Sequence, residues 1–138
     1  MAPASAPRKI RTPGVPARIE RGGGLIHQLR VYEIFESNKA AFHARFRDQA
    51  MRIMRKYGFE FIAMWEATTD RRIEFVYLLR WPDLATKEAA WREFMAHAEW
   101  KEIKRLTNAE HGDLVGEIED RVLTPTPYSP RAFAGQAR

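Results

Sequence analysis

Near the start of the predicted folded region, three polar side chains alternate with apolar ones. Gln28, Arg30 and Tyr32 are spaced by two residues. In a β-strand this places them about 7 Å apart on one face, with Leu29 and Val31 on the other. Arginine can bind a carboxylate or an enolate through two hydrogen bonds, and a tyrosine hydroxyl can transfer a proton. The spacing predicts catalytic roles for Arg30 and Tyr32 and a ligand-binding role for Gln28. The alternative is a polar network at a dimer interface, with Arg30 paired to an acid of the partner subunit.

Two further residues are candidates for proton transfer, and three tryptophans are candidates for ligand contacts. Tyr77 lies in a predicted strand, and His97 lies at a predicted helix break that would overhang the sheet. The indole rings of Trp65, Trp81 and Trp100 offer flat apolar walls, each with one N–H donor. The alternative for the aromatic residues is core packing, and for His97 a capping or surface position.

Metal and nucleotide sites have no support in the sequence. There is no cysteine, and the four histidines (His27, His43, His97 and His111) lack the i, i+4 spacing of a helical metal pair. Neither a phosphate-binding glycine loop nor a serine-hydrolase motif occurs. We therefore expect no metal and no cofactor. Haem binding, with His97 as axial ligand, is the weaker alternative.

The elements that position these residues follow from hydrophobic periodicity. Residues 26–32 form the first strand. A helix then extends from Ser37, as N-cap, to Gly58, with an apolar stripe between them. That stripe consists of Phe42, Phe46, Ala50, Ile53 and Tyr57.

A hairpin, a second helix and a last strand complete the predicted elements. Residues 59–67 and 73–81 read as two antiparallel strands. Asp83 caps a second helix, whose apolar phase slips between residues 96 and 99 and so predicts a break. A polar loop over 108–112 and a strand over 114–123 follow.

This order predicts an α+β fold, a ferredoxin-like βαββαβ sandwich with a four-stranded antiparallel sheet. Both helices would cover one face and leave the other apolar and bare. Large exposed apolar faces mark a partner, and a two-fold homodimer would bury this one.

Five separated motifs resemble those of the NIPSNAP family. Residues 26–32 (IHQLRVY) are similar to its opening strand, with Gln28 at a position where the family usually has an acid. Tyr57-Gly58-Phe59 followed by Trp65, the segment 76–84 and Glu99-Trp100 match later motifs. The ending LTPTPYSP, residues 123–130, completes the resemblance.

The resemblance implies a ferredoxin-like sandwich that dimerises into a dimeric α/β barrel. It implies little about chemistry, because proteins that share the dimeric α/β barrel fold catalyse several different reactions or only bind ligands. Members often carry His and Trp in the third strand, where this chain has Tyr77 and Leu79.

The charge is unevenly distributed along the 138 residues. The net charge is +5, but residues 1–24 and 128–138 carry enough of the excess to leave the stretch 25–127 at −1. We interpret 1–24 as a flexible basic arm rich in Pro and Gly, 25–127 as the folded domain and 128–138 as a C-terminal tail. We expect no nucleic-acid or membrane partner and a cytoplasmic location.

The leading hypothesis is a homodimer that binds a small, partly apolar carbonyl or carboxylate ligand between sheet and helices. If it is an enzyme, cofactor-independent proton transfer or monooxygenation fits these residues best. The alternative is a non-catalytic ligand-binding or protein-interaction scaffold.

Overall fold

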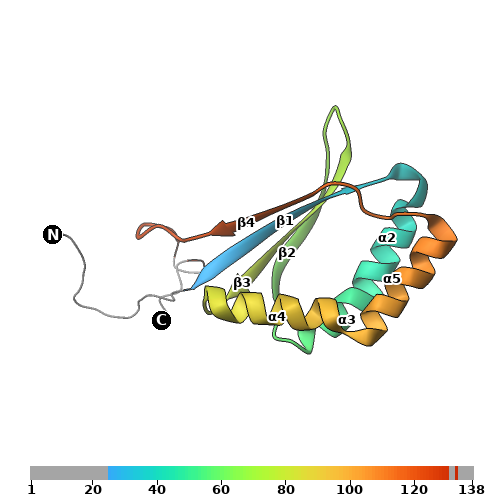
Figure 1. Ribbon diagram of the computed structural model, residues 1–138. Helices are drawn as coiled ribbons and strands as arrows, with labels where there is room; N and C mark the ends of the chain where they lie inside the picture. The colour runs from blue at the N-terminus through green and yellow to red at the C-terminus, as the bar shows by residue number, and fades with distance from the viewer. Residues whose placement is uncertain (1–24, 131–132, 134–138) are drawn as a thin grey trace.

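Four antiparallel strands form one sheet in the computed structural model, which describes residues 25–130 and Phe133. The strands are β1 (Ile26–Ile34), β2 (Glu60–Thr68), β3 (Ile73–Trp81) and β4 (Ile118–Leu123), in the spatial order β2-β3-β1-β4. β1 pairs with both β3 and β4, so it is central (Figure 1). The predicted ferredoxin-like fold is confirmed. The predicted arm, residues 1–24, lies outside the described residues.

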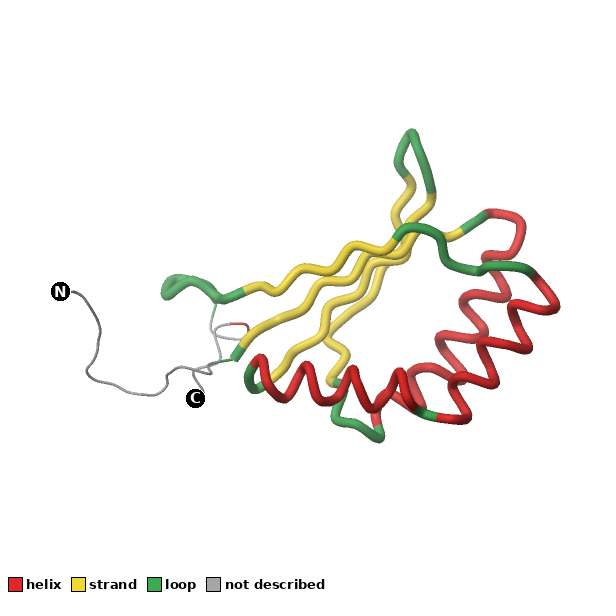
Figure 2. The backbone as a smooth tube through the Cα atoms, viewed as in Figure 1, coloured by secondary structure: helices red, strands yellow, loops and turns green. Residues whose placement is uncertain are grey.

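The helices between residues 36 and 111 all lie on one side of this sheet (Figure 2). The first helical region joins η2 (Glu36–Asn38), α2 (Lys39–Arg45), η3 (Phe46–Ala50) and α3 (Met51–Arg55). The second consists of α4 (Leu84–Ala96) and α5 (Ala98–His111). The core fills the layer between sheet and helices.

The first helical region contains a wider turn than the sequence predicted. η3 is a π-helical segment, and it lies where the apolar stripe repeats every four residues (Phe42, Phe46, Ala50). A regular helix has 3.6 residues per turn, so the wider turn keeps these residues on the buried side. Gly58 ends the helix at a φ of 87°, as predicted. Ser37 as N-cap was wrong, because it lies exposed inside η2 and no side chain caps α2.

The second helical region breaks at His97, as predicted. His97 has ψ at 125°, which interrupts the helix between α4 and α5. Asp83 caps α4 by accepting a hydrogen bond from the Thr86 amide at 2.7 Å. The predicted loop over 108–112 was wrong, because α5 continues to His111 and Gly112 is its C-cap. The last strand begins at Ile118 rather than residue 114.

The sheet face away from the helices is apolar at its centre. By strand alternation it carries Leu29 and Val31 of β1 opposite Leu78 and Val76 of β3. Trp65 of β2 lies beside Val76 and is 52% exposed. We call this surface the open face.

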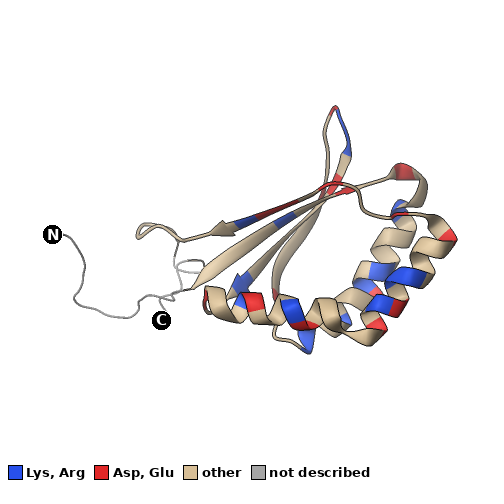
Figure 3. Ribbon diagram, viewed as in Figure 1, with Lys and Arg blue, Asp and Glu red and all other residues tan. Residues whose placement is uncertain are grey.

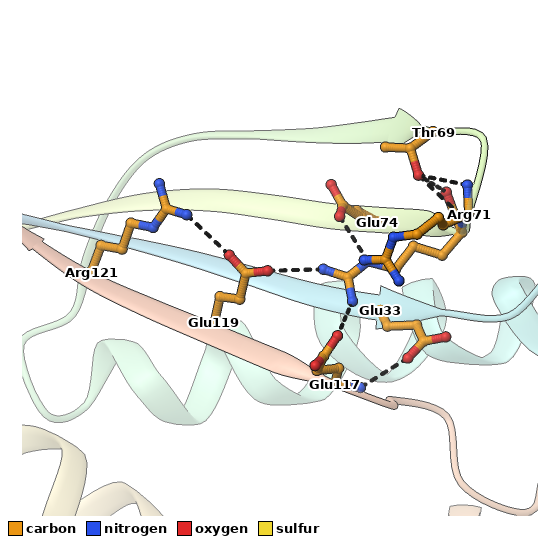
Figure 4. Close-up of polar contacts among 8 residues, drawn as sticks. Glu33, Thr69, Arg71, Glu74, Glu117, Glu119 and Arg121 are labelled. Carbon is orange, nitrogen blue, oxygen red and sulfur yellow. Dashed lines mark hydrogen bonds and ion pairs between the residues drawn. The ribbon is translucent and has the colours of Figure 1, made fainter.

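Charged clusters border the open face at both ends. At the hairpin end, Arg72 forms ion pairs with Glu74, Glu117 and Glu119, and Arg121 also binds Glu119 (Figure 4). At the other end, Arg80 pairs with Glu60 at 2.6 Å. The open face therefore combines an apolar centre with charged ends.

Candidate functional site

A cavity of about 160 Å³ lies between the sheet and the helices. β1 contributes Arg30 and Tyr32, α4 contributes Trp91, and α5 contributes Trp100. Further walls come from the aromatic stripe of the first helical region and from β4. The helices therefore cover the hydrogen-bonding face of β1, whereas the apolar Leu29 and Val31 face outward.

Arg30 is held by three side chains of its own subunit. Its Nη1 donates to Asp120 Oδ2 at 3.0 Å, its Nη2 to the Tyr32 hydroxyl at 3.1 Å, and its Nε to the Tyr77 hydroxyl at 3.4 Å. The guanidinium carbon lies 4.3 Å from the centre of the Trp91 ring. Burial disfavours the charged form of Arg30 and by itself would lower its pKa. The hydrogen bonds and charge interactions with Tyr32 and Tyr77 outweigh this effect and raise the pKa of Arg30, so the side chain stays cationic. Arg30 thus has an acidic partner, Asp120, within its own chain.

Tyr32 and Tyr77 form a short hydrogen bond, with 2.6 Å between their hydroxyl oxygens. Tyr77 is fully buried, and burial raises its pKa well above the usual value for a phenol. Tyr77 therefore stays protonated at neutral pH and can donate to Tyr32. Tyr32 and Arg30 line the cavity but Tyr77 does not, so Tyr77 lies behind Tyr32.

Gln28 is completely buried and does not line the cavity. Its Oε1 accepts hydrogen bonds from Trp81 Nε1 at 2.9 Å and Trp91 Nε1 at 2.8 Å. Its Nε2 donates to the Asp120 carboxylate at 3.1 Å. Gln28 therefore orients a cavity wall and the counter-ion of Arg30, rather than reaching a ligand directly.

The three predicted ligand-binding tryptophans are in three different places. Trp100 is part of the cavity wall and stacks on Phe94, with ring centroids 5.1 Å apart. Trp81 is fully buried in the core beneath Gln28. Trp65 lies on the open face, on the other side of the sheet from the cavity.

His97 does not line this cavity. Its Nδ1 lies 2.7 Å from the Tyr57 hydroxyl, and its Nε2 lies 3.7 Å from Glu99. The structure thus brings together Arg30, Tyr32, Tyr77 and Trp100 but places His97 apart from them, at the junction of α4 and α5.

Four residues that shape the site were not predicted from the sequence as site residues. Asp120 neutralises Arg30, Trp91 stacks on it, and Arg45 and Lys104 add two further cations to the cavity wall. One signal was present: Lys104 follows Trp100 by four residues, so both lie on the same helix face. Asp120 carried no such signal, because its partner lies 90 residues earlier in the chain.

Within the described residues, no group of three His, Cys, Asp or Glu side chains could hold a metal ion. None of the helices described is both long and apolar enough to cross a bilayer.

With this geometry established, comparison with known proteins assigns the chain to a family. The family model described as NIPSNAP matches residues 27–130. The chain belongs to the NIPSNAP family. This confirms the resemblance seen in the motifs of the sequence. Comparison with curated proteins finds no match.

Solved NIPSNAP structures share the fold at low sequence identity. An uncharacterized NIPSNAP-like domain protein from Burkholderia xenovorans is 20% identical, with a TM-score of 0.66; the match covers 78% of this chain and 90% of the Burkholderia chain. A NIPSNAP family protein from Agrobacterium tumefaciens is 16% identical with a TM-score of 0.66, covering 77% and 97%. A NIPSNAP family protein with unknown function from the same organism is 16% identical with a TM-score of 0.65, covering 80% and 96%. These similarities show the fold alone.

Proposed function

We propose that this NIPSNAP chain binds a small, partly apolar molecule bearing a carbonyl or carboxylate group in the cavity between sheet and helices. One observation carries the proposal: the cavity joins Arg30 and Tyr32 to the aromatic walls of Trp91 and Trp100. The polar pair offers hydrogen bonds to an oxygen, and the indole faces offer contacts to a ring or chain. A cavity of about this size binds benzene in an engineered protein.

Proton transfer without a cofactor is the second candidate function, and the tyrosine pair favours it. If Tyr32 gives its hydroxyl proton to a bound enolate, the Tyr32 O–H bond breaks and a bond to hydrogen forms on the ligand. The phenolate left behind would accept hydrogen bonds from Tyr77 and Arg30, whose donors already lie 2.6 and 3.1 Å from its oxygen. Donors held in place around a developing negative charge stabilise it without reorganisation.

The proposal includes a homodimer formed through the open face. Leu29, Val31, Val76 and Leu78 give that face an apolar centre, which a second copy would remove from water. A protein-interaction scaffold would use the same face without needing the cavity.

Arg30→Leu separates the ligand-binding function from the scaffold. We expect native mass spectrometry of the wild-type protein, purified gently from its own host, to show a dimer with a bound mass that denaturation releases. Arg30→Leu should remain a folded dimer and lose the bound mass. A variant that keeps the bound mass would remove Arg30 from the binding site, and a folded wild type that carries no ligand would favour the scaffold.

Leu78→Glu tests the dimer interface. Leu78 is half-buried at the centre of the open face, so a carboxylate there should give a folded monomer. Leu106→Glu, on the exposed side of α5, is the matched control and should remain dimeric. A Leu78→Glu dimer would place the interface elsewhere.

A further inference from the structure

We propose that the cavity selects anionic ligands, specifically single-ring aromatic carboxylates, and that Arg45 and Lys104 rather than Arg30 provide this selectivity. The inference rests on the proposed ligand-binding function and adds the charge and size of the ligand. It also assigns two binding residues that lie across the cavity from β1.

Arg30 offers little net charge to a ligand. Its guanidinium is paired with Asp120 at 3.0 Å, and three of its nitrogens already donate to side chains. An ion pair presents a dipole rather than a full positive charge to a third group. Arg30 therefore suits a carbonyl or hydroxyl oxygen, but it is not the main attraction for an anion.

Arg45 of α2 and Lys104 of α5 flank the Trp100 ring. The Arg45 guanidinium carbon lies 5.5 Å, and the Lys104 Nζ 5.7 Å, from the centre of that ring. Figure 3 shows basic segments of these two helices side by side. Both cations line the same cavity as Arg30 and Trp91.

Neither cation is neutralised within the part of the chain that the structure describes. Arg45 donates to neutral oxygens only, Thr107 Oγ1 at 2.8 Å and Asn108 Oδ1 at 3.1 Å, and Lys104 forms no ion pair there. Two acids, Asp48 and Glu99, share with Arg45 the groove between α2 and α5. Each is held by another arginine: Asp48 by Arg47 and Glu99 by Arg52, both at 2.8 Å.

Two like charges in a partly buried site are unfavourable unless an anion joins them. Burial lowers the pKa of Arg45, and burial together with repulsion from Arg45 and Lys101 lowers the pKa of Lys104. A bound carboxylate would relieve this repulsion and could accept hydrogen bonds from both cations. The site is thus electrostatically complementary to a single negative charge beside an aromatic ring.

The size of the cavity limits the rest of the ligand. About 160 Å³ is close to the volume at which an engineered apolar cavity binds benzene. Trp100, Phe94 and Trp91 provide ring faces and edges around that space. One aromatic ring carrying a carboxylate meets both the charge and the volume.

Benzoate and benzyl alcohol are a matched anionic and neutral pair of probes for calorimetric titration. We expect the wild-type protein to bind benzoate about tenfold more tightly than benzyl alcohol, the effect of one charge-assisted contact. Lys104→Gln and Arg45→Gln should each remove most of that preference while leaving benzyl alcohol binding unchanged. Arg92→Gln, which removes an exposed charge from the neighbouring helix α4, should behave as wild type.

The outcomes separate this inference from the proposed function. Equal binding of the two probes by wild type, or a preference that survives both substitutions, would overturn the selectivity while leaving the cavity as a binding site. Binding of neither probe would count against the cavity itself as a site for ligands of this class. A preference lost equally in Arg92→Gln would attribute the preference to the overall charge of the protein rather than to contact with Arg45 and Lys104.

Discussion

Replacing Gln28 by Met tests whether the buried amide organises the site. Gln28 is completely buried, and its carbonyl oxygen is the shared acceptor for the indole N–H groups of Trp81 and Trp91. Methionine has a similar length and volume, so the substitution removes the polar atoms while keeping most of the packing. Its effect therefore reports on the hydrogen bonds.

The expected loss of stability follows from the exposure of the three partners. Trp81 is 0% exposed, so its N–H would be left without an acceptor, at about 1–3 kcal/mol. Trp91 is half-buried and Asp120 is 40% exposed, so water replaces part of what they lose. Asp120 also retains its ion pair with Arg30. We expect a total of about 2–4 kcal/mol, a large share of the roughly 5–15 kcal/mol of a typical domain.

Urea unfolding monitored by circular dichroism measures this loss. Trp91→Phe, alone and combined with Gln28→Met, completes a double-mutant cycle, because the phenylalanine needs no acceptor. We expect the loss caused by Gln28→Met to be smaller in the Trp91→Phe background. A loss of stability below about 0.5 kcal/mol for Gln28→Met alone would show that the buried amide does not organise the site, since the cost of leaving an indole N–H without an acceptor in a dry core exceeds that value.

Three further predictions concern the frame around the site. Asp83→Ala removes the acceptor for the Thr86 amide and should lower Tm by about a few degrees, measured by thermal circular dichroism; an unchanged Tm would show that α4 needs no cap. Burial, and to a smaller extent the charge of Arg80, lower the pKa of His27 in the folded protein. The unfolded chain therefore binds a proton at this histidine more readily than the folded protein does. The stability of the folded protein should decline as pH falls below the usual histidine pKa of 6.5. His27→Gln should flatten that decline between pH 7.5 and 5.5 in urea titrations, and an equal decline in both proteins would exclude His27 as its source. Arg72→Met removes the cation shared by three glutamates and should increase amide hydrogen exchange in β4, whereas Arg71→Met, at the exposed hairpin turn, should not.

The order of the strands and helices along the chain and the buried faces of the helices could be predicted from the sequence, because both depend on local periodicity. The alternation around Arg30 and the stripe from Phe42 to Ile53 each identify a face without knowledge of the fold. The turn residues Gly58 and Asp83 added boundaries, and both act as expected. Ser37 was wrongly predicted as N-cap because serine also occurs in short turns such as η2, where its side chain caps no helix.

The site was harder to predict, because its residues meet only in three dimensions. The sequence placed Arg30 and Tyr32 on one strand and Tyr77 on another, but it could not show that Asp120 would neutralise Arg30 from β4. Trp65 resembled the other tryptophans in type, yet strand alternation after the irregularity at Phe61–Ala63 places it on the open face. A bulge shifts every later side chain on its strand, and local sequence rarely reveals one.

Chemical-shift mapping of the four indole N–H groups during a benzoate titration distinguishes the cavity from the open face as the ligand-binding site. Trp100 and Trp91 line the cavity, Trp81 lies beneath it, and Trp65 lies on the opposite face of the sheet. We predict that the indole signals of Trp100 and Trp91 shift in a saturable way while that of Trp65 stays in place. A saturable shift of the Trp65 signal, with the Trp100 and Trp91 signals unchanged, would place the ligand on the open face and exclude the cavity as its binding site.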